Sequence, residues 1–295
     1  MDPRAWRRFL GNRGARMGMA IVLFLVLLAA LGPVALGLDP LMSDFDRGRG
    51  QEGEPLGPSA LHWLGTDVVY RDELSRLVYG ARLSLTIGVA ASALSLVIGT
   101  VTGLLAGYWQ GRTLGPAALR VSPDGIIMRL VDIGLCFPFL ILVMAIGAAL
   151  EEVTVGTVLV VLGSTSWLGT ARIVRAQTMR VRELEFVTAS RALGERMPMM
   201  LLRHVLPNLA GTLIVVGTIS IAQMILAESA LSYLNLGLPL PTPSWGHMLL
   251  EGQRNYGSAP WLLAAPGGAI FLAVMGFHLL GEGLRDAFEP REEGP

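Results

Sequence analysis

The sequence predicts an all-α, polytopic membrane protein with six transmembrane helices. Of its 295 residues 52% are hydrophobic and only 16% are charged, whereas about 25% are charged in a typical soluble domain. Six apolar segments are each long enough to cross a hydrocarbon core of about 30 Å. Because a backbone in lipid must satisfy its own hydrogen bonds, all six are expected to be helices. They cover residues 17–38, 81–108, 125–150, 153–177, 208–232 and 262–284.

The first segment is either a membrane anchor or a cleaved signal peptide. Five arginines precede it, which suits both interpretations: Arg4, Arg7, Arg8, Arg13 and Arg16. The apolar core of a signal peptide runs for about 7–15 residues, whereas residues 17–38 contain no charge at all. We therefore expect an anchor at 17–38, preceded by a cytoplasmic N-terminal segment at 1–16.

The arginines are distributed unevenly between the two sides of the membrane. With the N-terminus inside, the cytoplasmic segments hold 17 of the 23 arginines and the outer segments hold 6. Because arginine is enriched on the cytoplasmic side, both termini are expected there, with extracytoplasmic loops at 39–80 and 233–261. The remaining five spans form a core at 81–285, which includes a cytoplasmic loop at 178–207. Residues 286–295 form a cytoplasmic tail.

Composition and motifs argue against an enzyme. All 23 basic residues are arginine, so the chain has no lysine for a nucleotide-binding P-loop or for Schiff-base catalysis. Neither a G-x-S-x-G elbow nor an H-E-x-x-H motif occurs. His247 and Glu251, and likewise His278 and Glu282, have the i,i+4 spacing of two metal ligands, but a third ligand is not evident. We expect no catalytic residue, no metal and no cofactor bound by this chain.

The second segment carries four small residues at four-residue spacing, namely Ser95, Gly99, Gly103 and Gly107. Such a stripe lets a neighbouring helix approach closely. The neighbour is either another helix of this subunit or a helix of a partner subunit. Either way the stripe indicates packing and not chemistry.

Prolines interrupt two spans, Pro138 in the third and Pro266 in the sixth. Each can bend its helix statically or act as a hinge. The third and fourth spans are separated only by a turn marked by Glu151 and Glu152. In the second outer loop, Trp245 and Trp261 are candidate interfacial anchors.

Few ionisable residues lie at membrane depth: Asp132, Glu228, His278 and Glu282. None lies near the middle of a span as the proton relays of carriers do. An ion-driven secondary carrier, which would also need repeat-related broken helices, is therefore the less favoured alternative. A membrane-embedded enzyme is disfavoured too.

The segment EFVTASRALGERMPMMLLRHVLPNL, residues 185–209, is too charged to span a bilayer and too helix-prone for an ordinary loop. Residues 182–193 contain neither Gly nor Pro, and Gly194 suits the position after a helix end. Pro198 suits the first turn of a second short helix, which Pro207 would close. The segment is therefore predicted to form a helix–turn–helix with an exposed tip.

What this helix–turn–helix contacts is either lipid or protein. A helix resting on headgroups needs large apolar residues on one face and bases on the other. The small residues Thr188, Ala189, Ser190 and Ala192 do not provide that apolar face. A protein partner is therefore favoured.

TASRALGERMPMMLLRHVLP resembles the EAA loop of ABC-importer permease subunits, and its RHVLPN ending resembles the dipeptide/oligopeptide branch, C-type subunit. WRRFLGNRGARMG, HWLGTDVVYRDELSRLVYGAR, SYLNLGLPLPTPSWG and GEGLRDAFEPR also match, so the resemblance spans nearly the whole chain. There are departures. Thr188 replaces the glutamate, Ser190 replaces the second alanine and Tyr70 replaces a usual glycine, while residues 109–124 look longer than usual.

The resemblance implies the type I importer permease fold, in the inner membrane of a prokaryote. It implies that the loop from Thr188 to Pro207 couples this chain to separate ATPase subunits. The coupling residues would be Thr188, Ala189, Ser190, Arg191, Gly194, Glu195, Arg196, Pro198, His204, Leu206 and Pro207.

Its implied partners are a second homologous permease, two ATPase subunits that bind ATP and Mg²⁺, an extracytoplasmic substrate-binding protein and the lipid bilayer. The implied cargo is di- or oligopeptides, with nickel chelates, glutathione or another small solute as alternatives. On the fifth span, Ser220, Gln223 and Glu228 are candidates for the translocation pathway, with interhelical hydrogen bonding as the other interpretation of these three.

Overall fold

The computed structural model describes residues 3–37, 39–50, 53–113, 122–149 and 153–288. Within these ranges the regular structure is helical, with a few isolated β-bridges and no strand. Five helices are long and apolar enough to cross a membrane, and a bent helix pair makes a sixth span if counted as one. The predicted all-α class is confirmed. The turn expected at Glu151 and Glu152 and the tail residues 289–295 lie outside the described residues.

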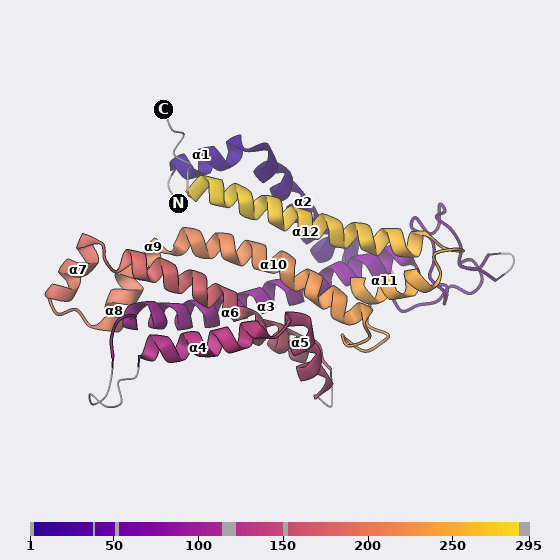
Figure 1. Cartoon of the computed structure of the whole chain (residues 1–295). Coiled ribbons are helices and arrows are strands. Elements are labelled where there is room, and N and C mark those ends of the chain that lie inside the picture. Colours follow the sequence, from indigo (N-terminus) through magenta and orange to yellow (C-terminus); the bar gives the residue numbers. More distant parts are fainter. Residues whose placement is uncertain (1–2, 38, 51–52, 114–121, 150–152, 289–295) are drawn as a thin grey trace.

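The long helices run side by side in an elongated bundle (Figure 1). The spans are α2 (Arg13–Leu36), α3 (Glu73–Trp109), α4 (Pro123–Cys136) with α5 (Phe139–Ala148), α6 (Val155–Val181), α10 (Ala210–Tyr233) and α12 (Trp261–Phe288). The short helices are α1 (Pro3–Gly11), α7 (Glu185–Ala192), α8 (Met197–Met200), α9 (Leu206–Asn208) and α11 (Trp245–Arg254), with a π-helical turn at Leu201–Val205.

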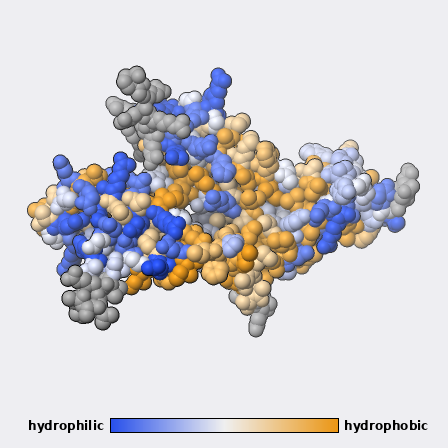
Figure 2. Space-filling view, viewed as in Figure 1, coloured by the Kyte–Doolittle hydropathy of each residue, from blue (hydrophilic) through white to orange (hydrophobic). Residues whose placement is uncertain are grey.

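The molecule has two polar ends and an apolar middle. Figure 2 shows hydrophobic residues covering the middle of the visible face and hydrophilic residues gathered toward both ends. One end carries α7 and α8, and the start of α1 and the end of α12 lie on the same side of the bundle (Figure 1). The opposite end carries α11 and the 39–72 loop. We refer to these as the α7–α8 end and the α11 end.

Several helices begin where the sequence supplies a short polar side chain. Such a side chain accepts a hydrogen bond from a backbone N–H that the first turn leaves unpaired. The capping residues are Asn12 for α2, Asp72 for α3, Ser122 for α4, Thr154 for α6 and Ser244 for α11.

The small-residue stripe of α3 packs against α6 of the same subunit. A Cβ atom added at Gly99 would lie 2.6 Å from the Cβ of Thr170, and one added at Gly103 would lie 2.6 Å from the Cβ of Val174. Gly107 faces Thr178 in the same way. The stripe thus lets the backbones of α3 and α6 approach so closely that no side chain fits between them at these glycines. Of the two alternatives, packing within the subunit is the one the structure contains.

The third span is not the single helix expected at 125–150. It breaks between Cys136 and Phe139, and the two halves, α4 and α5, meet at 87°. Pro138 provides the reason, because its ring disfavours helical geometry at the residue before it. Phe137 accordingly has extended backbone angles, φ −87° and ψ 132°. Pro266, in contrast, lies inside the continuous helix α12.

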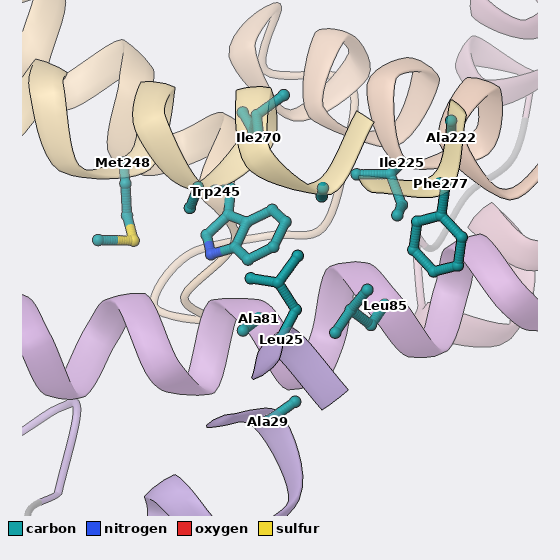
Figure 3. Packing of buried hydrophobic residues seen from close by; sticks show 12 residues of the cluster. Leu25, Ala29, Ala81, Leu85, Ala222, Ile225, Trp245, Met248, Ile270 and Phe277 are labelled. Atoms are coloured by element: carbon teal, nitrogen blue, oxygen red, sulfur yellow. The ribbon is translucent and has the colours of Figure 1, made fainter. Parts of the chain in front are cut away.

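Trp245 is a core residue and not the interfacial anchor that the sequence suggested. Its side chain is 0% exposed, and its indole N–H donates to the Leu77 carbonyl at 3.0 Å. Figure 3 shows the ring between Ile270 of α12 and Leu25 of α2, with Ala81 of α3 nearby. The first turn of α11 therefore fills the space between three spans. A burial of this kind depends on long-range packing that local sequence does not reveal.

Tyr70 occupies a backbone position that usually favours glycine. Its φ is +61°, and a residue with a Cβ adopts this left-handed region only at a cost. The Tyr70 hydroxyl donates to the Gly53 carbonyl at 2.8 Å, and its ring meets Phe45 edge-on at 5.6 Å. These contacts stabilise the 39–72 loop where a glycine would make none.

Candidate functional site

Residues 185–208 form a projecting elbow at the α7–α8 end (Figure 1). Helix α7 ends at Ala192, and Gly194 follows with φ +81°. The Glu195 N–H bonds the Ser190 carbonyl at 3.2 Å, and the Gly194 N–H bonds the Arg191 carbonyl at 3.1 Å. This pair of bonds is the Schellman motif that ends helices at a left-handed residue. The turn was correctly placed at Gly194 because this signal is local.

The second arm of the elbow differs from the expectation. Pro207 was expected to close a short second helix, but the helical backbone continues through the π-turn and α9 toward α10. The Leu206 N–H reaches back to the Leu201 carbonyl, five residues earlier. Pro207 then falls in the first turn of α9, where a missing N–H costs little. The elbow is consequently joined to α10 by nearly continuous helix.

A polar cluster joins the two arms of the elbow. Ser190 donates its hydroxyl to Oε2 of Glu195, and Nε2 of His204 lies 2.9 Å from the same oxygen. The hydrogen bond from Ser190, followed by the nearby His204 and Arg203, lowers the pKa of Glu195 below its ordinary value of 4.5. The Ser190 hydroxyl, a departure from the family pattern, therefore has a role. It helps to set the angle between α7 and the following helical segment.

The cluster predicts a pH response of the elbow. A carboxylate with a lowered pKa stabilises the folded state fully above its unfolded value near 4.5, and loses that contribution as the pH falls through the lower, folded value. We expect amide exchange of residues 190–204, corrected for its intrinsic pH dependence, to rise in an acid step as the pH falls below about 4.5, the ordinary pKa of a glutamate. Hydrogen exchange read by mass spectrometry measures this.

The variant Glu195→Gln should exchange faster already at neutral pH and show no acid step. Glu185→Gln is the matched control, because Glu185 lies on α7 and its side chain makes no hydrogen bond to another described residue. This control should keep the acid step. A step that persists in Glu195→Gln would show that another group is responsible.

The base of the elbow is fastened to the end of α3. Nη1 of Arg182 donates to the carbonyls of Gly107 and Gln110 at 2.8 and 3.0 Å, and Nη2 donates to the Gln110 side chain at 2.5 Å. In addition, buried apolar side chains of the elbow pack against α3 and α6. They are Val187, Met200, Leu201 and Val205, in contact with Leu104, Tyr108, Val174 and Val181. Arg182 was not among the predicted site residues, because its partners are backbone carbonyls more than 70 residues earlier in the sequence.

The predicted coupling residues gather on this one elbow. Thr188, Ala189, Arg191, Gly194, Arg196, Pro198 and Pro207 are exposed, while Ser190, Glu195, His204 and Leu206 are half-buried. The prediction missed Leu193, whose side chain is 88% exposed at the tip. Leu184, Phe186, Met199 and Leu202 are also exposed apolar residues of this region. An exposed apolar tip on a rigid support is typical of a protein-binding surface.

A second feature is an apolar pocket of about 450 Å³ beside the break between α4 and α5. It is lined by residues of α4, α5, α6 and α10. Its few polar groups are Thr165, Ser166 and Gln223.

The three residues predicted for a pathway are separated by the structure. Gln223 lines the pocket, and Ser220 is half-buried one turn away on α10. Glu228 is 1% exposed, and its two oxygens accept hydrogen bonds from Ser84 of α3 and Ser232, both at 2.9 Å. Glu228 is therefore a hydrogen-bonding residue inside the subunit, as the alternative interpretation had it. A carboxyl in a helix pattern does not reveal which neighbour it faces.

Within the described ranges, no three residues among His, Cys, Asp and Glu lie together so that they could hold a metal ion. Glu251, one of the spaced pairs considered from the sequence, accepts two hydrogen bonds from Arg76 at 2.6 and 3.1 Å. That guanidinium also bonds Asp67 at 2.5 Å. Glu251 thus belongs to an ion-pair network with Arg76 and Asp67 at the α11 end.

Comparison with known proteins agrees with this geometry. Residues 99–294 match the family model described as binding-protein-dependent transport system inner membrane component. Residues 4–49 match the N-terminal transmembrane domain of oligopeptide transport permease C. Among solved structures, the MetNI methionine ABC transporter in inward-facing conformations matches with a TM-score of 0.53 and 16% identity, over 72% of this chain and 95% of that chain.

Curated relatives match along almost the whole chain. The oligopeptide transport system permease protein OppC of Bacillus subtilis is 36% identical over 97% of this chain and 88% of its own length. The dipeptide permease protein DppC of the same organism is 36% identical over 97% and 85%. The glutathione transport system permease protein GsiD of Pectobacterium atrosepticum is 37% identical over 97% and 90%.

The fold is that of a type I ABC-importer permease, and the protein is a multi-pass permease of the bacterial inner membrane. The chain belongs to the family of binding-protein-dependent transport system inner membrane components.

Proposed function

We propose that this chain is the transmembrane permease subunit of an ATP-driven importer of di- and oligopeptides. The observation that carries the proposal is the elbow, a projecting helical segment with an exposed apolar tip and a firmly fastened base. The chain has no lysine with which to build a P-loop. Hydrolysis of ATP, with its Mg²⁺, therefore belongs to separate ATPase subunits, and this chain binds no cofactor.

The elbow suits the transfer of motion from those ATPases. The coupling residues from Thr188 to Pro207 would contact an ATPase on the cytoplasmic side, which places both termini in the cytoplasm as well. Arg182 ties the elbow to α3, while the helical continuation through Pro207 ties it to α10. Rigid helices pass a displacement at one end to the packed elements at the other. The α11 end then faces the substrate-binding protein outside.

A second, homologous permease would cover the face formed by α4, α5, α6 and α10. Among the residues of α4, only Asp124 and Val131 are buried within this subunit. Ile126, Leu130 and Ile133 are each more than half exposed. A span so poorly covered by its own chain suits a neighbour that completes its packing. The pocket beside the α4–α5 break, which includes Gln223, then lies on the pathway between the two permeases.

The peptide cargo is supported by the relatives whose names refer to oligopeptides and dipeptides. Glutathione import is the second candidate, because a glutathione permease is equally similar. The experiment is to purify the complex with its ATPases and binding protein, reconstitute it in liposomes, and measure ATP hydrolysis with each solute. Peptides should raise hydrolysis and accumulate inside. Stimulation by glutathione or a nickel chelate alone would reassign the cargo, and uptake driven by an ion gradient without ATPases would overturn the proposal.

A further inference from the structure

Two arginine–aspartate pairs join α4 to α6, and they differ in how many polar groups they leave free. Arg175 holds Asp124 through two parallel bonds, both 2.6 Å, and Asp124 is buried. Arg172 meets Asp132 through a single bond from Nη2 to Oδ1, 2.5 Å long. The side chains of Arg172 and Asp132 are 50% and 53% exposed. Within the described residues neither makes another hydrogen bond, which leaves Oδ2, Nε and Nη1 available.

The open pair lies well inside the bundle along the helix axes. Asp132 is nine residues from the start of α4 at Pro123, and Arg172 is nine residues from the end of α6 at Val181. At a rise of 1.5 Å per residue each lies about 14 Å along its own helix from the end nearer α7 and α8. Charged side chains within a membrane span are costly against hydrocarbon, so we expect this half-exposed pair to face water or protein.

The pair lies on two of the helices that line the apolar pocket, α4 and α6, although neither side chain is part of the lining. Gly134, two residues after Asp132, lines the pocket, and so does Gly169, three residues before Arg172. On both helices the charged residue lies on the α7–α8 side of the pocket. We expect a molecule that leaves the pocket toward that end to pass the free oxygen of Asp132 and the free N–H groups of Arg172.

We propose that Asp132 and Arg172 form a binding site for the ionised ends of a zwitterionic substrate, an inference that rests on the proposed function. Asp132 accepts hydrogen bonds from the substrate's ammonium group, and Arg172 donates to its carboxylate with the fork geometry that suits carboxylates. Peptides and glutathione both carry these two groups. Because the two side chains neutralise each other when no substrate is bound, neither charge is left unpaired before or after passage.

The test compares matched peptides in the reconstituted complex. Asp132→Asn should lower uptake of a tripeptide with a free amino terminus about tenfold, the effect of losing one charged hydrogen bond, and leave the N-acetylated peptide near the wild-type rate. Arg172→Gln should impair the free-carboxylate peptide and spare the C-terminal amide. The result is expressed, for each peptide, as the uptake rate of the variant divided by that of the wild type. Because the same binding protein delivers the peptide to both, its preference for one peptide over another cancels in this ratio. Asp124→Asn is the matched control, and its effect should be the same for every peptide.

Cys136 supplies a readout that needs no binding protein. It is the chain's single cysteine, it is exposed, and it lies one helical turn beyond Asp132 on α4. A water-soluble maleimide should label it in the assembled complex, and the free tripeptide should slow labelling. In Asp132→Asn this protection should disappear. Where the binding protein rejects a blocked peptide, the labelling experiment decides alone.

The outcomes separate the two levels of the proposal. If the wild-type complex takes up no peptide, the proposed function fails and this inference fails with it. If it takes up peptides but Asp132→Asn slows all of them equally, or leaves Cys136 protection unchanged, only the recognition role is overturned. The pair would then be a structural tie like that between Asp124 and Arg175.

Discussion

Replacing Leu193 with aspartate should uncouple transport from ATP hydrolysis while leaving the subunit folded and inserted. Leu193 is 88% exposed and lies between the end of α7 and Gly194. Its change removes almost no packing within the chain. In the assembled importer we expect this leucine to enter an apolar site on the ATPase, where a carboxylate would be buried without a partner. Losing a central contact of this kind costs about 2 kcal/mol or more, roughly a 30-fold loss of affinity.

Uptake and ATP hydrolysis in proteoliposomes measure this effect. Leu193→Asp should bring peptide-stimulated uptake close to background, with thermal stability and membrane insertion unchanged. Leu193→Met is the conservative control, because methionine keeps the apolar contact, and it should retain most of the activity. Normal coupling in Leu193→Asp would mean that the tip of the elbow does not bind the ATPase.

The second large effect is expected at the contact between α3 and α6. A leucine at Gly103 would place its Cβ 2.6 Å from the Cβ of Val174 and 2.7 Å from the Ala171 carbonyl oxygen. Neither neighbour can move without separating the two backbones. Overpacking a well-packed core costs about 1–3 kcal/mol, and forcing two spans apart should reach or exceed the top of that range. We therefore expect Gly103→Leu to abolish recovery of a monodisperse complex.

Size-exclusion chromatography and thermal unfolding in detergent measure this. The matched control is Gly268→Leu in α12, because an added Cβ at Gly268 meets nothing within 4 Å. This control should express and unfold much like the wild type. Equal behaviour of the two variants would contradict the close α3–α6 contact.

The fold was largely predictable because its main signals are local. Segment length and apolarity located the spans, and small residues at four-residue spacing marked the closest helix contact. The 87° bend was not predictable, although Pro138 marks where it occurs. A proline disrupts one turn, whereas the angle between the two halves depends on what each half packs against. The burial of Trp245 escaped prediction for the same reason.

The candidate sites also divide into features with a local sequence signal, which were predicted, and features set by long-range packing, which were not. The elbow was predicted because Gly194 and Pro198 define its turn within a few residues. Leu193 was missed, since an apolar residue in a helix pattern is more often buried. The pocket brings together residues from four helices, and a single sequence does not indicate which faces meet. Glu228 was accordingly nominated for the pathway although it faces the interior.

The central claim is that the elbow contacts a separate ATPase. The most direct measurement places a photoreactive amino acid at position 193 in the full complex and identifies its cross-linked partner. Position 89 in the middle of α3, where Val89 is 48% exposed, serves as the control. We expect position 193 to form an adduct with an ATPase chain, and position 89 to form none. Adducts of position 193 with lipid alone would contradict the account.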